Sequence, residues 1–219
     1  MIISIDGPAG SGKSTVAKKL SEKLNFIHFN SGSLYRAITA HLMKNNFNIN
    51  EILESTPVFE LNLEIKFIDG IQNVFVNNIN YTNDLRNNEV SNLTPVISTN
   101  KSIRKLVDTC QKDFCSKNNV VIDGRDIGSF VFPNAEVKFY LDCDLKERAK
   151  RRYLEEKQKN SKITLKSIEK EIEQRDFIDK TKKIAPLIVP NNAIIINSTH
   201  LTINEVVEKM FEISKEKTH

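Results

Sequence analysis

The chain has 219 residues, of which 39% are hydrophobic and 27% are charged. These proportions are typical of a globular protein and exclude collagen-like and disordered chains. No apolar run approaches the roughly 20 residues that a membrane-spanning helix needs. The formal net charge of +4 is mild and does not indicate a nucleic-acid-binding domain. We therefore expect one globular domain, with room for an insertion and a real hydrophobic core.

The cysteine content and the first residues of the chain indicate where in the cell the protein is expected. Three cysteines, an odd number, give no disulfide framework, and free thiols suit a reducing cytosol. Cys110 and Cys115 would point about 140° apart on a helix, which makes them poor joint metal ligands. The chain begins without a basic leader or a small-residue cleavage site, so no export signal is visible. We expect a cytoplasmic protein with buried or half-buried structural thiols.

Strands and helices alternate over the first part of the chain. Residues 1–6 form a short apolar strand candidate, and residues 14–24 carry apolar side chains at helical spacing. A second strand is expected over residues 25–29, followed by a second helix over residues 33–44. Alternation of this kind is typical of a parallel sheet covered by helices.

This order is interrupted at residues 61–76, where apolar and polar side chains alternate on both sides of Asp69 and Gly70. The pattern is typical of an antiparallel β-hairpin. It predicts a small inserted β subdomain over about residues 58–88. The whole inserted region is predicted to extend over residues 58–95.

The strand and helix order resumes in the second half of the chain. Helices are predicted over residues 99–114, 144–159, 164–180 and 202–214, and strands over residues 120–122, 137–141 and 193–196. The strands before residue 142 are nearly continuous apolar runs, which suit parallel strands buried on both faces. Thr202 and Glu205 have the spacing of a capping box. The predicted fold class is α/β, a doubly wound parallel sheet flanked by helices with a small antiparallel insertion.

The strongest functional signal is Gly-Pro-Ala-Gly-Ser-Gly-Lys-Ser at residues 7–14. It fits the phosphate-binding loop (P-loop) motif G-x-x-x-x-G-K-S, between a strand and a helix as this motif requires. Its glycines let successive N–H groups point at phosphate oxygens, and the helix adds its positive dipole end. Lys13 would span the terminal phosphates and the Ser14 hydroxyl would ligate Mg²⁺. An ordinary glycine-rich turn does not explain a lysine followed by a serine there.

The predicted phosphate contacts with ATP involve one continuous segment. Its residues are Gly7, Pro8, Ala9, Gly10, Ser11, Gly12, Lys13, Ser14 and Thr15. Kinases, GTPases, motor ATPases and nucleotide-dependent regulators all use such a loop. A GTPase normally carries Asn-Lys-x-Asp to read its base, whereas Asn100 and Lys101 are followed by Ser102 and Ile103. The missing aspartate counts against a GTPase.

Three further clusters favour phosphoryl transfer to a small acceptor. Ser-Gly-Ser-Leu-Tyr-Arg at residues 31–36 offers a hydroxyl, an aromatic ring and a guanidinium to a phosphomonoester. Asp-Gly-Arg-Asp at residues 123–126 ends a buried strand, at the usual ligand edge of an α/β sheet. Arg175 with Asp176, then Asp179 and Lys182, lie at intervals of four or fewer residues and could share one face of a polar helix or a mobile flap. The competing interpretations are a helix-capping serine, a structural Arg–Asp pair and a solvated charged face.

With these clusters in this order, the chain resembles bacterial cytidylate (CMP) kinases over nearly its whole length. The resemblance rests on the phosphate loop, the motifs at 31–36 and 123–126, Ile-Gly at 127–128, Val-Phe-Pro at 131–133, Arg175 with Asp176, and Ala-Pro-Leu at 185–187. The β insertion also matches this family, whose nucleoside-monophosphate-binding region is enlarged in the same way. The resemblance implies a reaction in which the γ-phosphoryl group of ATP is transferred to CMP or dCMP in the presence of Mg²⁺.

The resemblance also implies roles for individual residues. The residues implied to bind CMP are Ser31, Tyr35, Arg36, Arg104, Arg125, Asp126, Arg175, Asp179 and Lys182. Among these, Arg104 and Asp126 would read the cytosine. Lys13, Arg125 and Arg175 would supply the catalytic positive charge. Arg148 and Arg152 would belong to the ATP side of a helical lid over residues 150–182.

Two departures from the family pattern concern the acceptor. Pro95 stands where the family usually has a serine that helps to read the base. Because proline has neither a hydroxyl nor an N–H, that contact is lost or passes to Thr94 or Ser98. Lys182 stands where the family has an arginine, so the charge is kept but the bidentate fork is lost.

Two rival functions remain open at this point. A P-loop kinase for another nucleoside monophosphate, or for a metabolite such as shikimate, shares most of these features. A non-catalytic nucleotide-gated or nucleic-acid-binding protein would need a basic stripe with aromatic residues. The only hint of one, Lys-Arg-Arg-Tyr at residues 150–153, is soon followed by Glu155 and Glu156. We therefore expect ATP and CMP or dCMP as partners, no nucleic acid, no membrane, and a monomeric enzyme.

Overall fold

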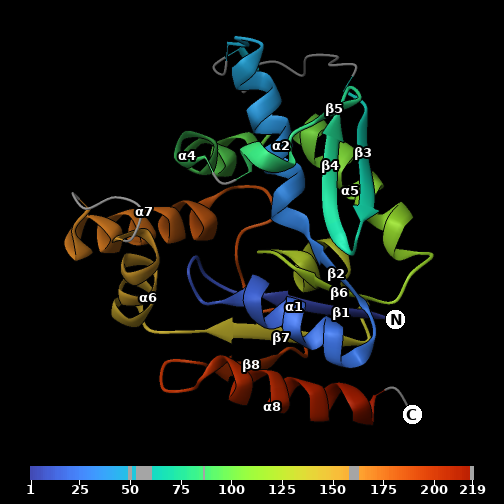
Figure 1. Ribbon diagram of the computed structural model, residues 1–219, viewed down its shortest axis with the longest axis vertical. Helices are drawn as coiled ribbons and strands as arrows, with labels where there is room; N and C mark the ends of the chain where they lie inside the picture. The colour runs from blue at the N-terminus through green and yellow to red at the C-terminus, as the bar shows by residue number, and fades with distance from the viewer. Residues whose placement is uncertain (49–50, 53–60, 86, 158–162, 218–219) are drawn as a thin grey trace. The chain divides into compact units, whose positions relative to one another are not determined.

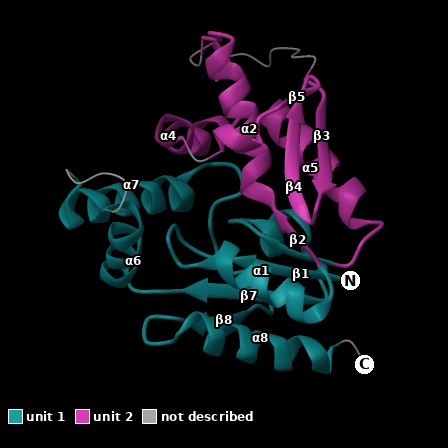
Figure 2. Cartoon of the chain, in the orientation of Figure 1, with its two compact units in different colours: residues 1–26, 120–219 teal, residues 27–119 magenta. Residues whose placement is uncertain are grey.

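The computed structural model describes residues 1–48, 51–52, 61–85, 87–157 and 163–217 (Figure 1). The chain divides into two compact units (Figure 2). Unit 1 contains Met1–Phe26 and Val120–His219, and unit 2 contains Ile27–Asn119. Residues 58–60 and 86 of the predicted insertion and residues 158–162 of the predicted lid lie outside the described residues. The boundaries given to these two segments stay predictions.

A parallel sheet forms the centre of unit 1. Its strands are β1 (Ile2–Asp6), β6 (Val120–Asp123), β7 (Val137–Asp142) and β8 (Ile194–Asn197). β1 pairs in parallel with β6 and with β7, and β7 pairs in parallel with β8. With β2 (Ile27–Asn30), the five-stranded sheet has the order β2-β6-β1-β7-β8. The predicted parallel α/β sheet is confirmed.

Four helices are described in unit 1. They are α1 (Lys13–Leu24), α6 (Leu145–Lys157), α7 (Leu165–Thr181) and α8 (Ile203–Glu216). Of these, α6 and α7 pack against each other and form a separate small apolar cluster. α1 packs against α8, and their apolar sides share one core with the sheet, in which Ile5, Leu20 and Met210 have no exposed surface. The predicted capping box opens α8, because Thr202 accepts from the Glu205 N–H and Glu205 reaches back to Thr202. α7 begins with a second box at Thr164, which was not predicted.

Unit 2 carries the antiparallel insertion. Its strands are β3 (Leu63–Ile68), β4 (Ile71–Val76) and β5 (Ile79–Asn80). β3 and β4 form the predicted hairpin, and the short β5 extends it. Asp69 and Gly70 connect β3 to β4 with φ values of 50° and 73°. Both central residues of this two-residue turn are left-handed, as a tight hairpin turn with right-handed strand twist requires.

The helices of unit 2 are α2 (Ser31–Lys44), α4 (Asn88–Ile97) and α5 (Lys101–Cys115), with a short 3₁₀ turn at Thr82–Asp84. α4 was not predicted, because Pro95 lies inside it and proline normally ends a helix. Asn87 caps its start by accepting from the Glu89 N–H, and Val90 and Ile97 are buried. Capping and burial offset the cost of the proline here.

The cysteines behave as expected. Cys115 and Cys143 are buried and Cys110 is half-buried, and all three are free thiols. Burial raises the pKa of Cys110 to about 11 and that of Cys115 to about 12. These two thiols are therefore protonated and unreactive at neutral pH. In the described part of the chain, no helix has the length and apolarity to cross a membrane.

Candidate active site

The phosphate loop connects the end of β1 to the start of α1. A Cβ atom added to Gly7 would lie 2.2 Å from the Leu141 carbonyl oxygen, so only glycine fits at this position. Gly12 has a φ of 88° and immediately precedes the first helical residue, Lys13. The left-handed backbone at this point favours glycine and turns the chain into the helix. Ser14 and Thr15, in the first turn of α1, are exposed.

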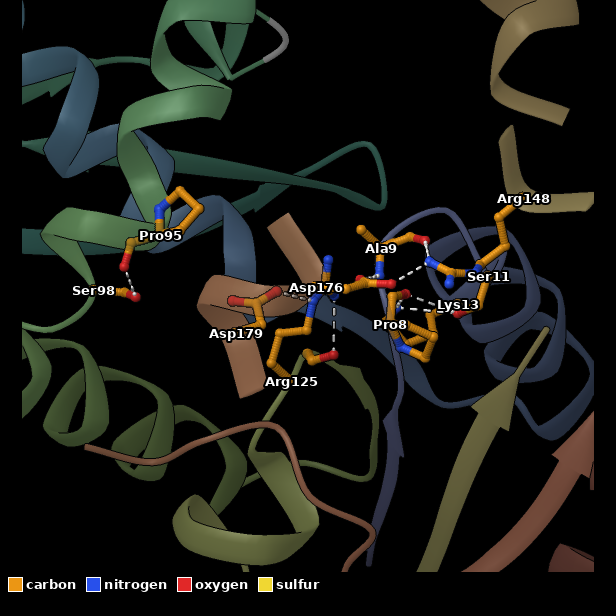
Figure 3. Close-up of polar contacts among 11 residues, drawn as sticks. Pro8, Ala9, Ser11, Lys13, Pro95, Ser98, Arg125, Arg148, Asp176 and Asp179 are labelled. Atoms are coloured by element: carbon orange, nitrogen blue, oxygen red, sulfur yellow. Dashed lines mark hydrogen bonds and ion pairs between the residues drawn. The ribbon is translucent and has the colours of Figure 1, made fainter. Parts of the chain in front are cut away.

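Lys13 lies folded back over the loop (Figure 3). Its Nζ donates to the Pro8 carbonyl at 2.5 Å and to the Ser11 hydroxyl at 3.2 Å. Burial, followed by the positive charge of Arg125, places the pKa of Lys13 well below its usual value. An anion bound to this loop would favour the charged form and reverse that shift.

Four charged side chains from other elements act on Lys13. Arg125 and Arg175 lower its pKa, whereas Asp123 and Asp179 raise it. The structure thus gathers three predicted catalytic residues, Lys13, Arg125 and Arg175, into one electrostatic cluster within unit 1. Such a concentration of positive groups is what a transferring phosphoryl group requires.

Ser14 is joined to the end of β6. Its hydroxyl donates to Asp123 Oδ2 at 2.6 Å, and Asp123 is buried. Among the described residues there is no group of three or more His, Cys, Asp or Glu that could hold a metal ion alone. A hydroxyl and a carboxylate nevertheless suit Mg²⁺, which takes few protein oxygens and completes its shell with phosphates and water. Ser14 was predicted from the sequence to bind the metal, whereas Asp123 was named only as part of the 123–126 motif and not as a metal ligand.

Arg125 is oriented by α7. Its Nε donates to Asp179 Oδ2 at 3.0 Å, and its Nη1 donates to the Gly124 carbonyl at 3.2 Å. The Arg125 side chain is 22% exposed, so it is not sequestered in the apolar core. Asp126 is buried nearby in sequence, and Arg175 on α7 is half-buried. The structure therefore brings the 123–126 motif and α7 together, as expected of an acceptor-phosphate site.

Asp6 is a buried carboxylate that sequence reasoning did not single out. It ends β1 with no exposed surface and accepts from the backbone N–H groups of Ile127 at 2.9 Å and Gly128 at 2.7 Å. These residues open a π-helical turn, Ile127–Val131. Burial raises the pKa of Asp6 from 3.8 to about 7. Asp6 thus ties the strand before the phosphate loop to the segment that follows Asp126.

The two arginines assigned to the lid make different contacts. Arg148 on α6 is buried and pairs with Asp176 of α7, with 2.6 Å between Nη1 and Oδ2. Arg152 pairs with Glu156 at 2.6 Å and with Glu171 at 2.8 Å. Their role in binding ATP stays a prediction. Lys182 follows the last residue of α7 and is half-buried.

A second cluster of predicted residues lies within unit 2. Ser31 donates to the Gln111 side chain at 2.9 Å. Arg36 Nη1 donates to the Leu85 carbonyl at 2.8 Å and to the Ser91 hydroxyl at 2.9 Å. These side chains are held by contacts inside their own unit, and their substrate roles stay predictions.

One of the two predicted base readers, Arg104, lies within unit 2 near the end of α4, whereas the other, Asp126, belongs to unit 1. Arg104 is buried, its Nη1 donates to the Ser98 carbonyl at 3.3 Å, and its guanidinium lies 5.8 Å from the centre of the Tyr35 ring. Thr94 donates its hydroxyl to the Val90 carbonyl at 2.6 Å, and Ser98 donates to the Pro95 carbonyl at 2.7 Å (Figure 3 shows the latter). The Ser98 proton is therefore used within its own segment, whereas the Thr94 hydroxyl also lies 3.3 Å from Thr39 Oγ1 of α2. Both oxygens can accept a further hydrogen bond.

The glycine-rich loop connects a parallel strand to a helix that begins with a lysine and a serine. An aspartate ends the neighbouring strand. This arrangement defines a P-loop nucleotide-binding protein. Comparison with known sequences identifies the family within this class of P-loop proteins. The model of the family described as cytidylate kinase matches residues 3–216. The chain belongs to the cytidylate kinase family.

Individual relatives agree with this assignment. A cytidylate kinase of Caldicellulosiruptor saccharolyticus is 41% identical over 212 residues, covering 96% of this chain and 94% of the relative. A cytidylate kinase of Listeria innocua is 39% identical over 216 residues, covering 98% and 96%. A solved structure of an uncharacterized protein from Eubacterium ventriosum matches with a TM-score of 0.53 at 14% identity, covering 99% and 98% of the two chains. That last likeness concerns the fold alone, and the resemblance drawn from the sequence motifs is confirmed by the first two.

Proposed function

We propose that the protein transfers the γ-phosphoryl group of ATP to CMP or dCMP, forming ADP and CDP or dCDP. The observation that carries this proposal is the charge cluster around Lys13, in a chain matched to the cytidylate kinase family over residues 3–216. The loop supplies the donor site, and family membership supplies the identity of the acceptor. Arg125 and Arg175 both act electrostatically on the loop lysine, as positive groups around a transferring phosphoryl group would.

The donor side acts through the backbone and Lys13. Loop N–H groups and the N-terminus of α1 bind the phosphates of ATP. Lys13 exchanges its present contacts with Pro8 and Ser11 for phosphate oxygens of the nucleotide. Ser14 and Asp123 are the residues that would hold Mg²⁺, which supplies positive charge to the phosphates.

On the acceptor side, Arg125 holds the phosphate of CMP, and Asp179 fixes its guanidinium through the 3.0 Å contact. Ser31 and Arg36 act on the same phosphate. Arg175 and Asp179 bind the sugar. No general base is needed, because the attacking phosphate oxygen is already ionised near neutral pH. Catalysis therefore rests on positioning and on positive charge around the transferring group.

The residues proposed to recognise the base are Asp126 and Arg104, whose guanidinium lies 5.8 Å from the centre of the Tyr35 ring. A cytosine differs from a uracil in two groups: it carries a donor amino group in place of a carbonyl, and its ring N3 accepts a hydrogen bond where that of uracil donates one. The hydroxyl oxygens of Thr94 and Ser98, which offer acceptors, suit the amino group. They are the groups that would replace the serine lost at Pro95. Lys182 provides charge without the arginine fork and makes a weaker phosphate contact.

The direct test is an acceptor panel. The purified enzyme is assayed for ADP production from MgATP with CMP, dCMP, UMP, AMP and shikimate in turn. We expect turnover with CMP and dCMP and much less with the other acceptors. Turnover confined to UMP, AMP or shikimate would assign another small-molecule kinase, and no turnover with either cytidine nucleotide would refute the proposal.

We further propose that the enzyme acts as a cytoplasmic monomer without nucleic acid or membrane partners. The mild charge and the interrupted basic run at residues 150–153 support this. Light scattering during size-exclusion chromatography is expected to give the mass of one chain. Filter binding to single-stranded RNA should show no affinity that falls steeply with salt, and such an affinity would favour the nucleic-acid rival.

A further inference from the structure

The peptide groups on either side of Ala9, in the middle of the phosphate loop, are held from outside the loop (Figure 3). The Ala9 N–H donates to Asp176 Oδ1 at 3.0 Å, and the Ala9 carbonyl accepts from Arg148 Nη1 at 2.7 Å. The methyl group of Ala9 belongs to a small apolar cluster with Ala149, Ile168 and Ile172 of α6 and α7. One loop residue is thus fixed through its donor, its acceptor and its side chain.

The two side chains that hold Ala9 also hold each other. Arg148 and Asp176 pair at 2.6 Å, and their side chains are only 7% and 10% exposed. Arg148 Nε donates in addition to the Cys143 carbonyl at 2.8 Å, which anchors it at the start of α6. Ala9, Asp176 and Arg148 therefore form a closed ring of hydrogen bonds between the loop and two helices. A buried charge-assisted network of this kind is rigid when every member is satisfied.

The glycines that follow Ala9 have conformational freedom that the hydrogen-bond ring can restrict. Gly10 and Gly12 have φ values of 74° and 88°, and glycine has more alternative conformations than any other residue. A loop that binds phosphate through its N–H groups loses affinity in proportion to the time it spends in other conformations. An external clamp on the residue beside Gly10 removes those alternatives before the nucleotide arrives.

We propose that Arg148 and Asp176 are positioning residues that hold the phosphate loop in its anion-binding conformation, so that α6 and α7 set the affinity for ATP. The proposal rests on the proposed function in that it takes ATP as the donor. It gives Arg148 a role that acts through Ala9, in addition to the place on the ATP side of the lid that the family likeness implies.

Substitution of Asp176 tests the proposal through the direction in which ATP affinity changes. A carboxylate near an anion site repels the anion, so its removal would tighten ATP binding if charge alone mattered. A positioning role predicts weaker ATP binding, because loss of the carboxylate releases the loop from its anion-binding conformation. Asp176→Ala removes both contacts, whereas Asp176→Asn keeps an acceptor for the Ala9 N–H and loses the charge pair. We expect ATP affinity to fall in the order wild type, Asp176→Asn, Asp176→Ala.

The measurement is the dissociation constant of a fluorescent ATP analogue with Mg²⁺ and without acceptor. Loss of a hydrogen bond to a charged group predicts about tenfold weaker binding for Asp176→Ala. The matched control is Glu173→Gln, an exposed acidic residue on the same helix, which should leave the constant unchanged. CMP affinity, measured separately by calorimetry, should change less than ATP affinity. Equal or tighter binding of the analogue by the Asp176 variants would overturn the proposal.

Arg148 gives an independent arm should the Asp176 variants fold poorly. Arg148→Met leaves the Asp176 carboxylate buried without its partner, and Arg148→Lys retains the charge but not the fork. Positioning predicts that the lysine variant recovers part of the affinity lost in the methionine variant. Thermal unfolding is recorded for each variant. A fall in melting temperature with no loss of ATP affinity would show a purely structural pair and would also overturn the proposal.

The outcomes separate this inference from the proposed function. If the wild-type enzyme binds the ATP analogue but phosphorylates neither CMP nor dCMP, the proposed function fails while the Asp176 test remains valid. If CMP is phosphorylated and ATP affinity does not depend on Asp176, the proposed function stands and the positioning role fails.

Discussion

The phosphate loop of unit 1 and the predicted acceptor cluster of unit 2 (Ser31, Arg36 and Arg104) are proposed to bind anions, and they are built in different ways. The loop is one continuous segment, and side chains distant in sequence, Asp123 and Asp176 among them, hold its polar groups. The acceptor candidates Ser31, Arg36 and Arg104 come from two helices and contact amides and carbonyls of their own unit. Donor binding is therefore built mainly from backbone, and acceptor binding mainly from side chains.

This difference predicts how each region responds to substitution. In the loop, most side chains shape the backbone, and Lys13 alone brings a full positive charge to the nucleotide. In the acceptor cluster each arginine is a separate contact with the substrate, so a single substitution removes a single contact. Donor affinity should therefore depend on loop conformation, and acceptor affinity on individual side chains.

The largest effect is expected at Lys13. Lys13→Gln removes the only loop charge directed at the transferring group, and loss of one such electrostatic contact predicts a fall in kcat of about 10²- to 10³-fold. Steady-state kinetics with ATP and CMP measure it, with the exposed Lys18→Gln on the same helix as the matched control. Wild-type turnover by Lys13→Gln would remove the loop from the mechanism.

A smaller effect, confined to the acceptor, is expected at Arg125. Arg125→Lys keeps the charge but cannot hold Asp179 and a phosphate with one planar fork. Losing one charge-assisted hydrogen bond predicts about a tenfold rise in KM for CMP, with KM for ATP nearly unchanged. Arg151→Lys, which alters an arginine paired with Glu147, is the matched control. A rise in KM for ATP instead would show that Arg125, which lies in unit 1 outside the loop, serves the donor rather than the acceptor.

The buried carboxylate before the loop predicts a pH-dependent stability. Because the pKa of Asp6 is raised from 3.8 to about 7, the folded protein keeps a proton there that the unfolded chain releases. The stability this adds is fully present below about pH 4 and is lost as the pH rises to about 7. Asp6→Asn should remove this slope. Urea unfolding of both proteins at several pH values measures it, with the exposed Asp113→Asn as control.

For Asp6, the contradictory result is a constant difference in the free energy of unfolding between wild type and Asp6→Asn over that pH range. It would mean that the carboxylate is ionised in the folded protein. Asp6 would then hold Ile127 and Gly128 as a charged acceptor at every pH tested.

The smallest effect is expected in base selection. If Ser98 supplies the acceptor lost at Pro95, Ser98→Ala should lower the preference for CMP over UMP by about two- to tenfold, the range for one neutral hydrogen bond. Thr94→Val tests the alternative hydroxyl with the same readout, the ratio of kcat/KM for the two acceptors. An unchanged ratio in both variants would leave the reading of the base to Arg104 and Asp126.

Local patterns in the sequence were sufficient for several elements. The phosphate loop, the hairpin at Asp69 and Gly70 and the capping box at Thr202 each depend on residues a few positions apart. For that reason the sequence alone was enough to predict them. Most acceptor candidates lie in clusters that the sequence itself indicated, but Arg104 could be named only through the family resemblance, since nothing in the spacing indicates that Tyr35 and Arg104 meet.

The remaining features arise from tertiary packing. α4 forms around Pro95 because capping and burial outweigh its low helix propensity. The contact between Arg148 and Asp176 joins residues on different helices, and the charge pattern of α7 gave no sign that Asp176 is buried against Ala9. Asp6 looked like the last residue of a strand, and only its burial shows that it accepts from Ile127 and Gly128.

The most direct test of the whole account follows the transferred group itself. The enzyme is incubated with ATP labelled in the γ-phosphoryl group, with and without CMP, and the labelled products are separated. We predict that the label appears in CDP when CMP is present and stays in ATP when it is absent. Label released as inorganic phosphate at the same rate with and without CMP would show hydrolysis rather than transfer and would contradict the account.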